Sequence, residues 1–107
     1  MIFESLTESA ARGELILVEG GFCRFHIRRD GQLTIREIIV VTPGTGIGSA
    51  ILNRLKSAGR SSGANCIVAK CPTDLAANGW YKSRGFINMR DEATRTGRKL
   101  NVWRLSI

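Results

Sequence analysis

One stretch of the sequence, residues 38–55 (IIVVTPGTGIGSAILNRL), limits the possible folds more than any other. Its first four residues are apolar and β-branched, which is typical of a strand covered on both faces. Pro43 ends this strand, and three glycines then allow a tight backbone bend. Ile47, Ile51 and Leu55 follow at the spacing of one helix face. The stretch therefore predicts a buried strand, a glycine bend and the beginning of a helix.

A bend of this kind can bind an anion. Glycines let the backbone approach a ligand closely, and the free amides of the first helical turn point toward it. The bend lacks the lysine that follows the glycines of a P-loop. Its glycines, Gly44, Gly46 and Gly48, also lack the Gly-x-Gly-x-x-Gly spacing of a dinucleotide-binding loop. A plain tight turn is the alternative interpretation.

The glycine spacing resembles the pyrophosphate-binding loop of the GCN5-related N-acetyltransferases (GNAT), commonly written RGxGIGxxL. Residues 44–51 (GTGIGSAI) match its glycines, whereas Pro43 stands where the family has Gln or Arg. A second family motif, Asn-x-x-Ala-x-x-Phe-Tyr-x-x-x-Gly-Phe, resembles residues 74–86 (DLAANGWYKSRGF), with Asp74 in place of the Asn. The two motifs stand in the family's order, with one expected helix and one expected strand between them.

Periodicity and turn residues predict the other elements. Helices are expected over residues 3–11, 46–59 and 73–84, and strands over residues 14–19, 22–29, 32–41, 66–70, 86–90 and 99–105. Asp30-Gly31 predicts a hairpin, and the helix before residue 66 predicts a parallel strand pair. Thr73 is the expected N-cap of the last helix, and residues 91–98 are expected to be polar and mobile.

These elements predict one domain over residues 1–107, a mixed α/β fold with a mostly antiparallel sheet flanked by helices. The order is that of the GNAT family with the N-terminal helical region reduced. Apolar runs are too short for a membrane-spanning helix, which needs about 20 residues. The N-terminus has no basic segment typical of a signal peptide, so a cytoplasmic protein is expected.

The resemblance implies direct transfer of an acetyl group from acetyl-CoA to a primary amine, on a small molecule or a lysine. The residues that it places at the cofactor are Val41, Gly44, Thr45, Gly46, Ile47, Gly48, Ser49 and Asp74. Arg54, Lys56 and Arg60 are further candidates for contacts with the outer phosphates. Pro43 lacks an amide, and the carboxylate of Asp74 would repel phosphates unless it caps a helix or pairs with Lys70. Both departures should weaken cofactor binding.

The same resemblance suggests the catalytic groups. The position of Tyr81 in the motif implies a general acid, because a phenol (pKa about 10) is protonated at neutral pH and can protonate a departing thiolate. Glu37 is the candidate base, acting directly or through water. The alternatives are that Tyr81 belongs to the core and that Glu37 pairs with Arg36 or a cross-strand arginine. His26 is a weaker candidate and more typical of a structural residue.

Four potential metal ligands occur in the sequence: Cys23, His26, Cys66 and Cys71. Offsets of three and five residues along two strands place each pair on opposite faces of the sheet. We therefore expect no metal and interpret the three cysteines as buried, reduced thiols.

Three functions follow from these observations. The first is a minimal N-acetyltransferase, in which a homodimer could complete the short acceptor site by pairing free sheet edges. The second is an inactive relative that binds an acyl-CoA or a protein, which Pro43 and Asp74 favour. The third is a small nucleic-acid-binding protein, suggested by the net charge of +7. Interleaved aromatic residues are missing, so nucleic acid is the weaker partner.

Overall fold

The computed structural model describes residues 2–107, with their side chains from Thr7 onward. The elements are α1 (Ile2–Ala11), β1 (Leu15–Val18), β2 (Gly21–Ile27), β3 (Gln32–Val40), α2 (Ile47–Ser61), β4 (Cys66–Pro72), α3 (Ala77–Ser83), β5 (Ile87–Ala93) and β6 (Lys99–Ser106). This confirms the predicted element order and the mixed α/β fold. The six strands form one sheet in the order β1-β2-β3-β4-β6-β5, in which β3 and β4 are parallel and the other neighbours antiparallel.

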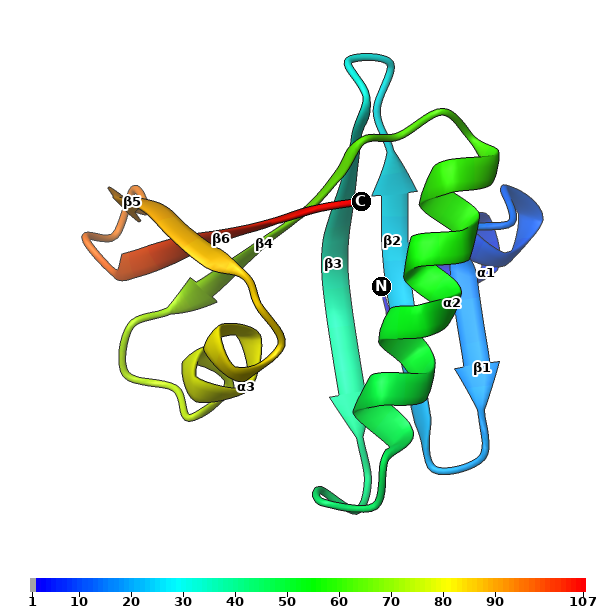
Figure 1. Cartoon of the computed structure of the whole chain (residues 1–107), viewed down its shortest axis with the longest axis horizontal. Helices are drawn as coiled ribbons and strands as arrows, with labels where there is room; N and C mark the ends of the chain where they lie inside the picture. Colours follow the sequence, from blue (N-terminus) through cyan, green and yellow to red (C-terminus); the bar gives the residue numbers. More distant parts are fainter. Residues whose placement is uncertain (1) are drawn as a thin grey trace.

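The parallel pair is short, and the sheet opens beside it. β3 and β4 pair only from Gln32 with Cys66 to Ile35 with Ala69. Past these residues β3 continues along β2, whereas β4 continues along β6. The two strands diverge and leave a wedge in the sheet, which Figure 1 shows between β3 and β4. The register against β2 skips Arg36, a bulge that adds twist where the wedge begins.

The helices lie on both faces of this sheet (Figure 1). α2 packs across β1–β3, α3 packs near β4 and β5 on the same side, and α1 contacts β1 and β2 from the other side. The predicted apolar face of α2 enters the core, where Ile51 and Leu55 are fully buried with Leu33 and Phe25. Among residues 2–107, no helix has the length and apolar character needed to cross a membrane.

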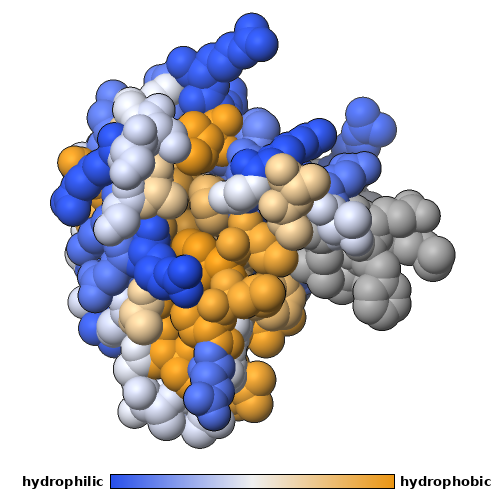
Figure 2. Space-filling view, turned by 90° about the vertical axis from the view of Figure 1, so that its right-hand side faces the viewer, coloured by the Kyte–Doolittle hydropathy of each residue, from blue (hydrophilic) through white to orange (hydrophobic). Residues whose placement is uncertain are grey.

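One apolar area is left uncovered at the β1 side of the sheet, which faces the viewer in Figure 2. Leu17, Phe22 and Ile39 are cross-strand neighbours on β1, β2 and β3. The residues beside them, Ile16 and Cys23, point into the core under α2, so the three face the other way. Leu17 is 66% exposed and Ile39 is 44% exposed. We call these three residues the apolar row.

Two helix boundaries differ from the prediction. α2 continues through Gly59 to Ser61, and Gly59 lets the chain end pass close by, because a Cβ there would lie 2.7 Å from Cδ1 of Ile107. α3 begins only at Ala77, and Thr73 is not its N-cap. The preceding turn is held by Asn78 instead, whose Nδ2 donates to the carbonyls of Pro72 and Leu75, both at 2.8 Å.

The prediction that residues 91–98 form a mobile segment is wrong for its first part, because β5 runs to Ala93. Glu92 anchors this strand by accepting contacts from Lys70 Nζ at 2.8 Å and Arg90 Nη2 at 2.9 Å. The remainder is a tight turn in which the Thr94 amide donates to the Arg98 carbonyl at 2.9 Å, and the Arg98 amide donates to Oγ1 of Thr94 at 3.1 Å. The charged residues at the end of β5 are not typical of a strand, so the sequence did not predict that the strand continues to Ala93.

Candidate functional site

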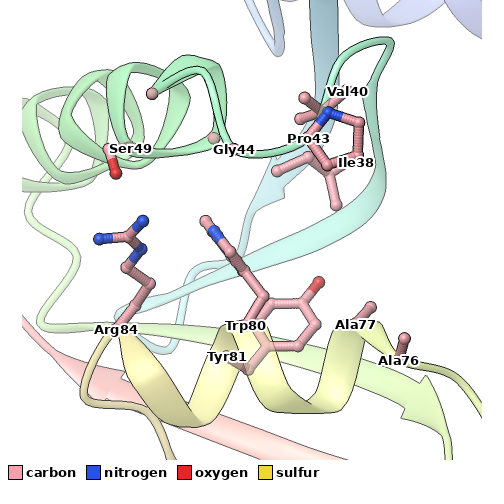
Figure 3. Close-up of a pocket in the computed structure, with 12 residues that line it drawn as sticks. Ile38, Val40, Pro43, Gly44, Ser49, Ala76, Ala77, Trp80, Tyr81 and Arg84 are labelled. Carbon is pink, nitrogen blue, oxygen red and sulfur yellow. The ribbon is translucent and has the colours of Figure 1, made fainter.

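A cavity of about 490 Å³ fills the wedge between β3, the first turn of α2 and one face of α3 (Figure 3). Its lining residues are Ile38, Val40, Pro43, Gly44, Gly46, Gly48, Ser49, Ala76, Ala77, Trp80, Tyr81 and Arg84. The two sequence motifs, residues 44–51 and 74–86, therefore meet around one space. The strand side and the α3 side are mainly apolar, and the loop end is formed by backbone and small residues.

The loop end of the cavity is suited to an anion. Gly44 and Gly46 have φ angles of 82° and 83°, a left-handed conformation that strongly favours glycine. Thr45 fixes the bend by donating from Oγ1 to the carbonyl of Thr42 at 2.7 Å. Within the described part of the chain, no side chain caps α2 and no acidic residue occupies its first turn, so its positive dipole end is uncompensated. Gly48 and Ser49 on that turn line the cavity.

Tyr81 points its hydroxyl group from α3 into the cavity (Figure 3). Tyr81 is only 4% exposed. Its ring makes edge contacts with Trp80 and Phe86 and stacks on Trp103. Burial raises the pKa of the phenol well above its ordinary value, and nearby Cys71 raises it further. The hydroxyl therefore stays protonated at neutral pH, as a general acid requires.

Arg84 is a site residue that the sequence interpretation missed. It lines the cavity, and its guanidinium group extends toward Ser49 on α2 (Figure 3). The guanidinium carbon also lies 5.9 Å from the ring centre of Trp80. The spacing in the sequence could have indicated it. Ala77, Tyr81 and Arg84 recur at helical intervals on one face, so a tyrosine that faces the cavity implies an arginine beside it.

Close packing joins the two walls of the cavity. An added Cβ at Gly48 would lie 3.1 Å from Nε1 of Trp80, so the glycine allows α3 to approach α2. Asn78 fixes α3 from behind, because its Oδ1 accepts hydrogen bonds from Trp103 Nε1 and Asn101 Nδ2, both at 2.9 Å. These contacts hold Tyr81 and Arg84 in position relative to the loop.

Other predicted cofactor residues lie at the edge of this space or outside it. Thr45 and Ile47 are not among its lining residues, and the amide of Val41 donates to the Gly20 carbonyl at 2.7 Å. Asp74 is exposed and pairs with Arg98 at 3.6 Å, rather than with Lys70. Contacts of these residues with a cofactor stay predictions.

Of the candidates for the outer phosphates, Arg54 donates from Nη1 to the carbonyl of Leu17 at 3.1 Å, and no residue of this group lines the cavity. The cation at the cavity is Arg84, on the other motif.

The candidate base is less well placed. Glu37 follows the β3 bulge and pairs with Arg24 in the register, and its Oε1 is buried without a hydrogen-bond partner in the described part of the chain. It does not line the cavity. His26 lies by Glu14 instead, with 2.9 Å between Nδ1 and Oε2. Its neighbour is therefore a different carboxylate from Glu37.

The cysteines are not among the residues that line this cavity. Cys23, Cys66 and Cys71 are free and buried. Burial raises the pKa of the Cys23 thiol to about 12, and the charge of Glu37 contributes, so this thiol is neutral at physiological pH. Within the described residues, no three His, Cys, Asp or Glu side chains are grouped to hold a metal ion.

No protein-family model and no curated protein sequence matches this chain. Its structure is similar to that of the ribosomal-protein-S18-alanine N-acetyltransferase from Escherichia coli, with a TM-score of 0.67 and 23% identity over 82% of this chain and 61% of that one. It is also similar to a proposed streptothricin acetyltransferase from Bacillus anthracis in complex with acetyl coenzyme A, with a TM-score of 0.74 and 17% identity. The chain has the GNAT fold.

The GNAT fold is present here in a short form. The chain covers 61% and 56% of the lengths of the two acetyltransferases, so it spans about three fifths of each. A further similar structure, the anti-CRISPR protein AcrVA5, is of nearly the same size. The match covers 86% of this chain and 96% of AcrVA5, with a TM-score of 0.67 and 22% identity.

Proposed function

We propose that this protein is an N-acetyltransferase that transfers the acetyl group of acetyl-CoA directly to a primary amine. The observation that carries the proposal is the wedge cavity, which has the glycine loop at one end and the Tyr81 hydroxyl inside. The similarity to a structure that holds acetyl coenzyme A supports this use of the cavity.

In the proposed complex, the pyrophosphate would lie on the amides between Gly44 and Ser49, at the positive end of α2. Arg84 would supply the cation that the family has at the position of Pro43. The pantetheine arm would follow Ile38 and Val40, on the part of β3 that has no strand partner in the wedge. Apolar contacts along that wall suit its methylene groups.

The proposed reaction forms one bond and breaks another. The neutral amine nitrogen attacks the thioester carbonyl carbon, and the carbon–sulfur bond then breaks to leave an amide and a thiolate. Tyr81 would give its proton to the thiolate. Glu37 would accept the proton from the attacking amine, through water because its carboxylate lies outside the cavity lining.

An inactive acyl-CoA-binding protein is the second candidate. The position of Glu37 favours it, because the cavity has no carboxylate among its lining residues. Such a protein would keep cofactor affinity and show no turnover with any amine.

The melting temperature with and without excess acetyl-CoA tests the proposal, with CoA and ADP as comparisons. A ligand at about 100 times its Kd adds about 2.7 kcal/mol to the free energy of unfolding, which raises the Tm by several degrees in a domain of this size. We expect that rise with acetyl-CoA and CoA. An unchanged Tm at millimolar acetyl-CoA would refute both the enzyme and the acyl-CoA-binding protein.

We also propose that the protein acts in the cytoplasm as a homodimer. Three free thiols suit a reducing compartment. The apolar row supports a dimer, because its exposed side chains adjoin the free edge strand β1.

A further inference from the structure

A second cavity, of about 570 Å³, lies on the other face of the sheet. Its lining residues are Arg24, His26, Arg28, Gln32, Thr34, Ile35, Arg36, Val68 and Lys70. They come from β2, β3, β4 and the turn after β2, and none is a carboxylate, Phe, Tyr or Trp. We call this cavity the basic groove.

The basic groove begins where the wedge begins. Ile35 is the last residue of β3 that pairs with β4, and Arg36 is the bulged residue that follows. Both line the groove, whereas the next residues along β3 that line a cavity, Ile38 and Val40, belong to the other face. The two cavities thus approach the opening of the sheet from opposite sides. A ligand in the groove could extend a group through the wedge.

Two of its arginines have no carboxylate partner among the side chains that the structure describes. Arg28 pairs with Asp30 at 3.2 Å, Lys70 pairs with Glu92 at 2.8 Å, and His26 lies beside Glu14. For Arg24 and Arg36, no ion pair occurs within the described part of the chain, although Glu37 stands opposite Arg24 in the register. An acid-free wall with two unpaired guanidinium groups attracts anions and repels polyamines and basic peptides.

We propose that the basic groove binds the acetyl acceptor and that this acceptor is an acidic peptide segment, with Asp or Glu beside the reacting amine. The inference rests on the proposed acetyltransferase function. Arginine forks bind carboxylates with two hydrogen bonds, and Gln32 and Thr34 offer polar groups to a peptide backbone. Three adjacent strands span about 10 Å, the length of roughly three extended residues. A nucleic acid fits less well, because the lining has no Phe, Tyr or Trp on which bases could stack.

Peptide binding to the CoA-loaded protein tests this without turnover. Three fluorescent peptides share a central lysine and carry Glu, Gln or Lys on both sides, and anisotropy gives their Kd values. We expect the Glu peptide to bind about tenfold more tightly than the Gln peptide and the Lys peptide to bind most weakly. Arg24→Glu and Arg36→Glu should each weaken the Glu peptide about tenfold and change the Gln peptide less than about twofold.

Arg95→Glu is the matched control, since it makes the same charge change at an exposed position in the turn between β5 and β6, outside the lining of the groove, and should change each Kd less than about twofold. The milder variants Arg24→Gln and Arg36→Gln serve if a charge reversal fails to fold. Equal affinity for the Glu and Gln peptides would overturn the proposal. So would a single-stranded oligonucleotide that displaces the Glu peptide at about 150 mM salt.

The proposal for the acceptor and the proposal of acetyl transfer can be tested independently of each other. If acetyl-CoA and CoA leave the Tm unchanged while the wild type prefers the Glu peptide and the arginine variants lose this preference, acetyl transfer is refuted and acidic-peptide recognition is supported. If the Tm rises and the peptides bind equally, the cofactor site is supported and the acidic acceptor is refuted.

Discussion

Tyr81 combines two properties that rarely occur together in a core residue. Its ring is enclosed by Trp80, Phe86 and Trp103, yet its oxygen points into a cavity, with no hydrogen-bonding partner among the side chains that the structure describes. The ring therefore accounts for packing, and the hydroxyl is available for chemistry. Burial raises the pKa of this hydroxyl, so its protonated form persists throughout the neutral range.

Tyr81→Phe should separate these two properties. The variant keeps the ring contacts, so we expect a change of less than about 1 kcal/mol in the free energy of unfolding and an unchanged Kd for acetyl-CoA. If the phenol protonates the thiolate, kcat should fall at least about 100-fold. Steady-state kinetics and thermal shift with acetyl-CoA measure both effects. Full activity in the variant would rule out Tyr81 as the acid.

Glu14 is the second residue whose environment determines a measurable property. Burial by itself would raise the pKa of this carboxyl group, but a 2.8 Å hydrogen bond from the Ile27 amide and the adjacent His26 outweigh it, so the pKa is lowered. The ionised form is thus stabilised by folding. Its contribution is complete above the unfolded-state pKa of about 4.3 and is lost as the pH falls through the lower folded-state pKa.

We expect Glu14→Gln to remove about 1–2 kcal/mol from the free energy of unfolding at pH 7 and to flatten the decline of stability below about pH 4.5. Urea titrations at several pH values measure this. Glu19→Gln, at an exposed turn position, is the control and should leave the profile unchanged. A Glu14→Gln profile parallel to that of the wild type would contradict the lowered pKa.

At the scale of elements, the cavity depends on how closely α3 approaches α2. The contact between Gly48 and Trp80 sets that approach, and both residues line the cavity. Gly48→Leu should fill the space with a side chain and displace the indole ring. We expect it to abolish the rise in Tm with acetyl-CoA.

Gly79→Leu provides the matched comparison for this change. Gly79 lies on α3, but a Cβ there would meet nothing within 4 Å. Because leucine favours helix more than glycine, this variant should gain up to about 1 kcal/mol in stability and keep the acetyl-CoA shift. Retention of the shift by both variants would show that the cavity is not the cofactor site.

Much of the element order could be predicted from the sequence because local chemistry determines it. The spacing of Ile47, Ile51 and Leu55 marks α2, and Gly85, with φ of 90°, ends α3 as expected. The predicted helix boundaries were wrong where contacts between distant residues determine them. Gly59 packs against Ile107 at the end of α2. Asn78, rather than Thr73, orders the start of α3. A single sequence does not show which distant residues meet.

The candidate site could be predicted only in part, for a related reason. Residues that belong to a local motif, such as Gly44, Gly48 and Tyr81, could be found from the sequence pattern, and they do line the cavity. The wedge itself follows from the register of β3 on β4, which ends at Ile35. That register has no local signature. The unpaired arginines of the basic groove depend on it as well, because three strands must align to bring them together.

At the scale of the whole molecule, the short chain concentrates both proposed ligand sites around a single break in the sheet. The chain spans about three fifths of the acetyltransferases to which it is similar, but nearly the whole of AcrVA5. A complete wedge therefore fits within a chain of this length. With few residues outside the sheet and its three helices, a large part of one sheet face is left for partners.

The apolar row leads to a prediction about assembly. Leu17, Phe22 and Ile39 lie on the same sheet face as the arginines of the basic groove, so a second copy bound there would border the proposed acceptor. Burial of exposed leucine and isoleucine side chains favours association, and Leu17→Lys should oppose it because a lysine would be desolvated without a partner. We expect sedimentation velocity to show a wild-type dimer whose dissociation constant rises at least about tenfold in this variant.

Ile87→Lys distinguishes this surface from the opposite edge of the sheet. Ile87 is as exposed as Leu17, at 66%, but lies on β5, at the far edge from β1. The β5 edge has a bulge near Met89 and several charged residues, features that disfavour pairing between sheet edges. Ile87→Lys should therefore leave the dimer intact. If Ile87→Lys alone dissociates the dimer, the interface lies at β5 rather than at β1. A wild-type protein that is monomeric at all concentrations would exclude the homodimer. Each chain would then bind acceptor and cofactor by itself.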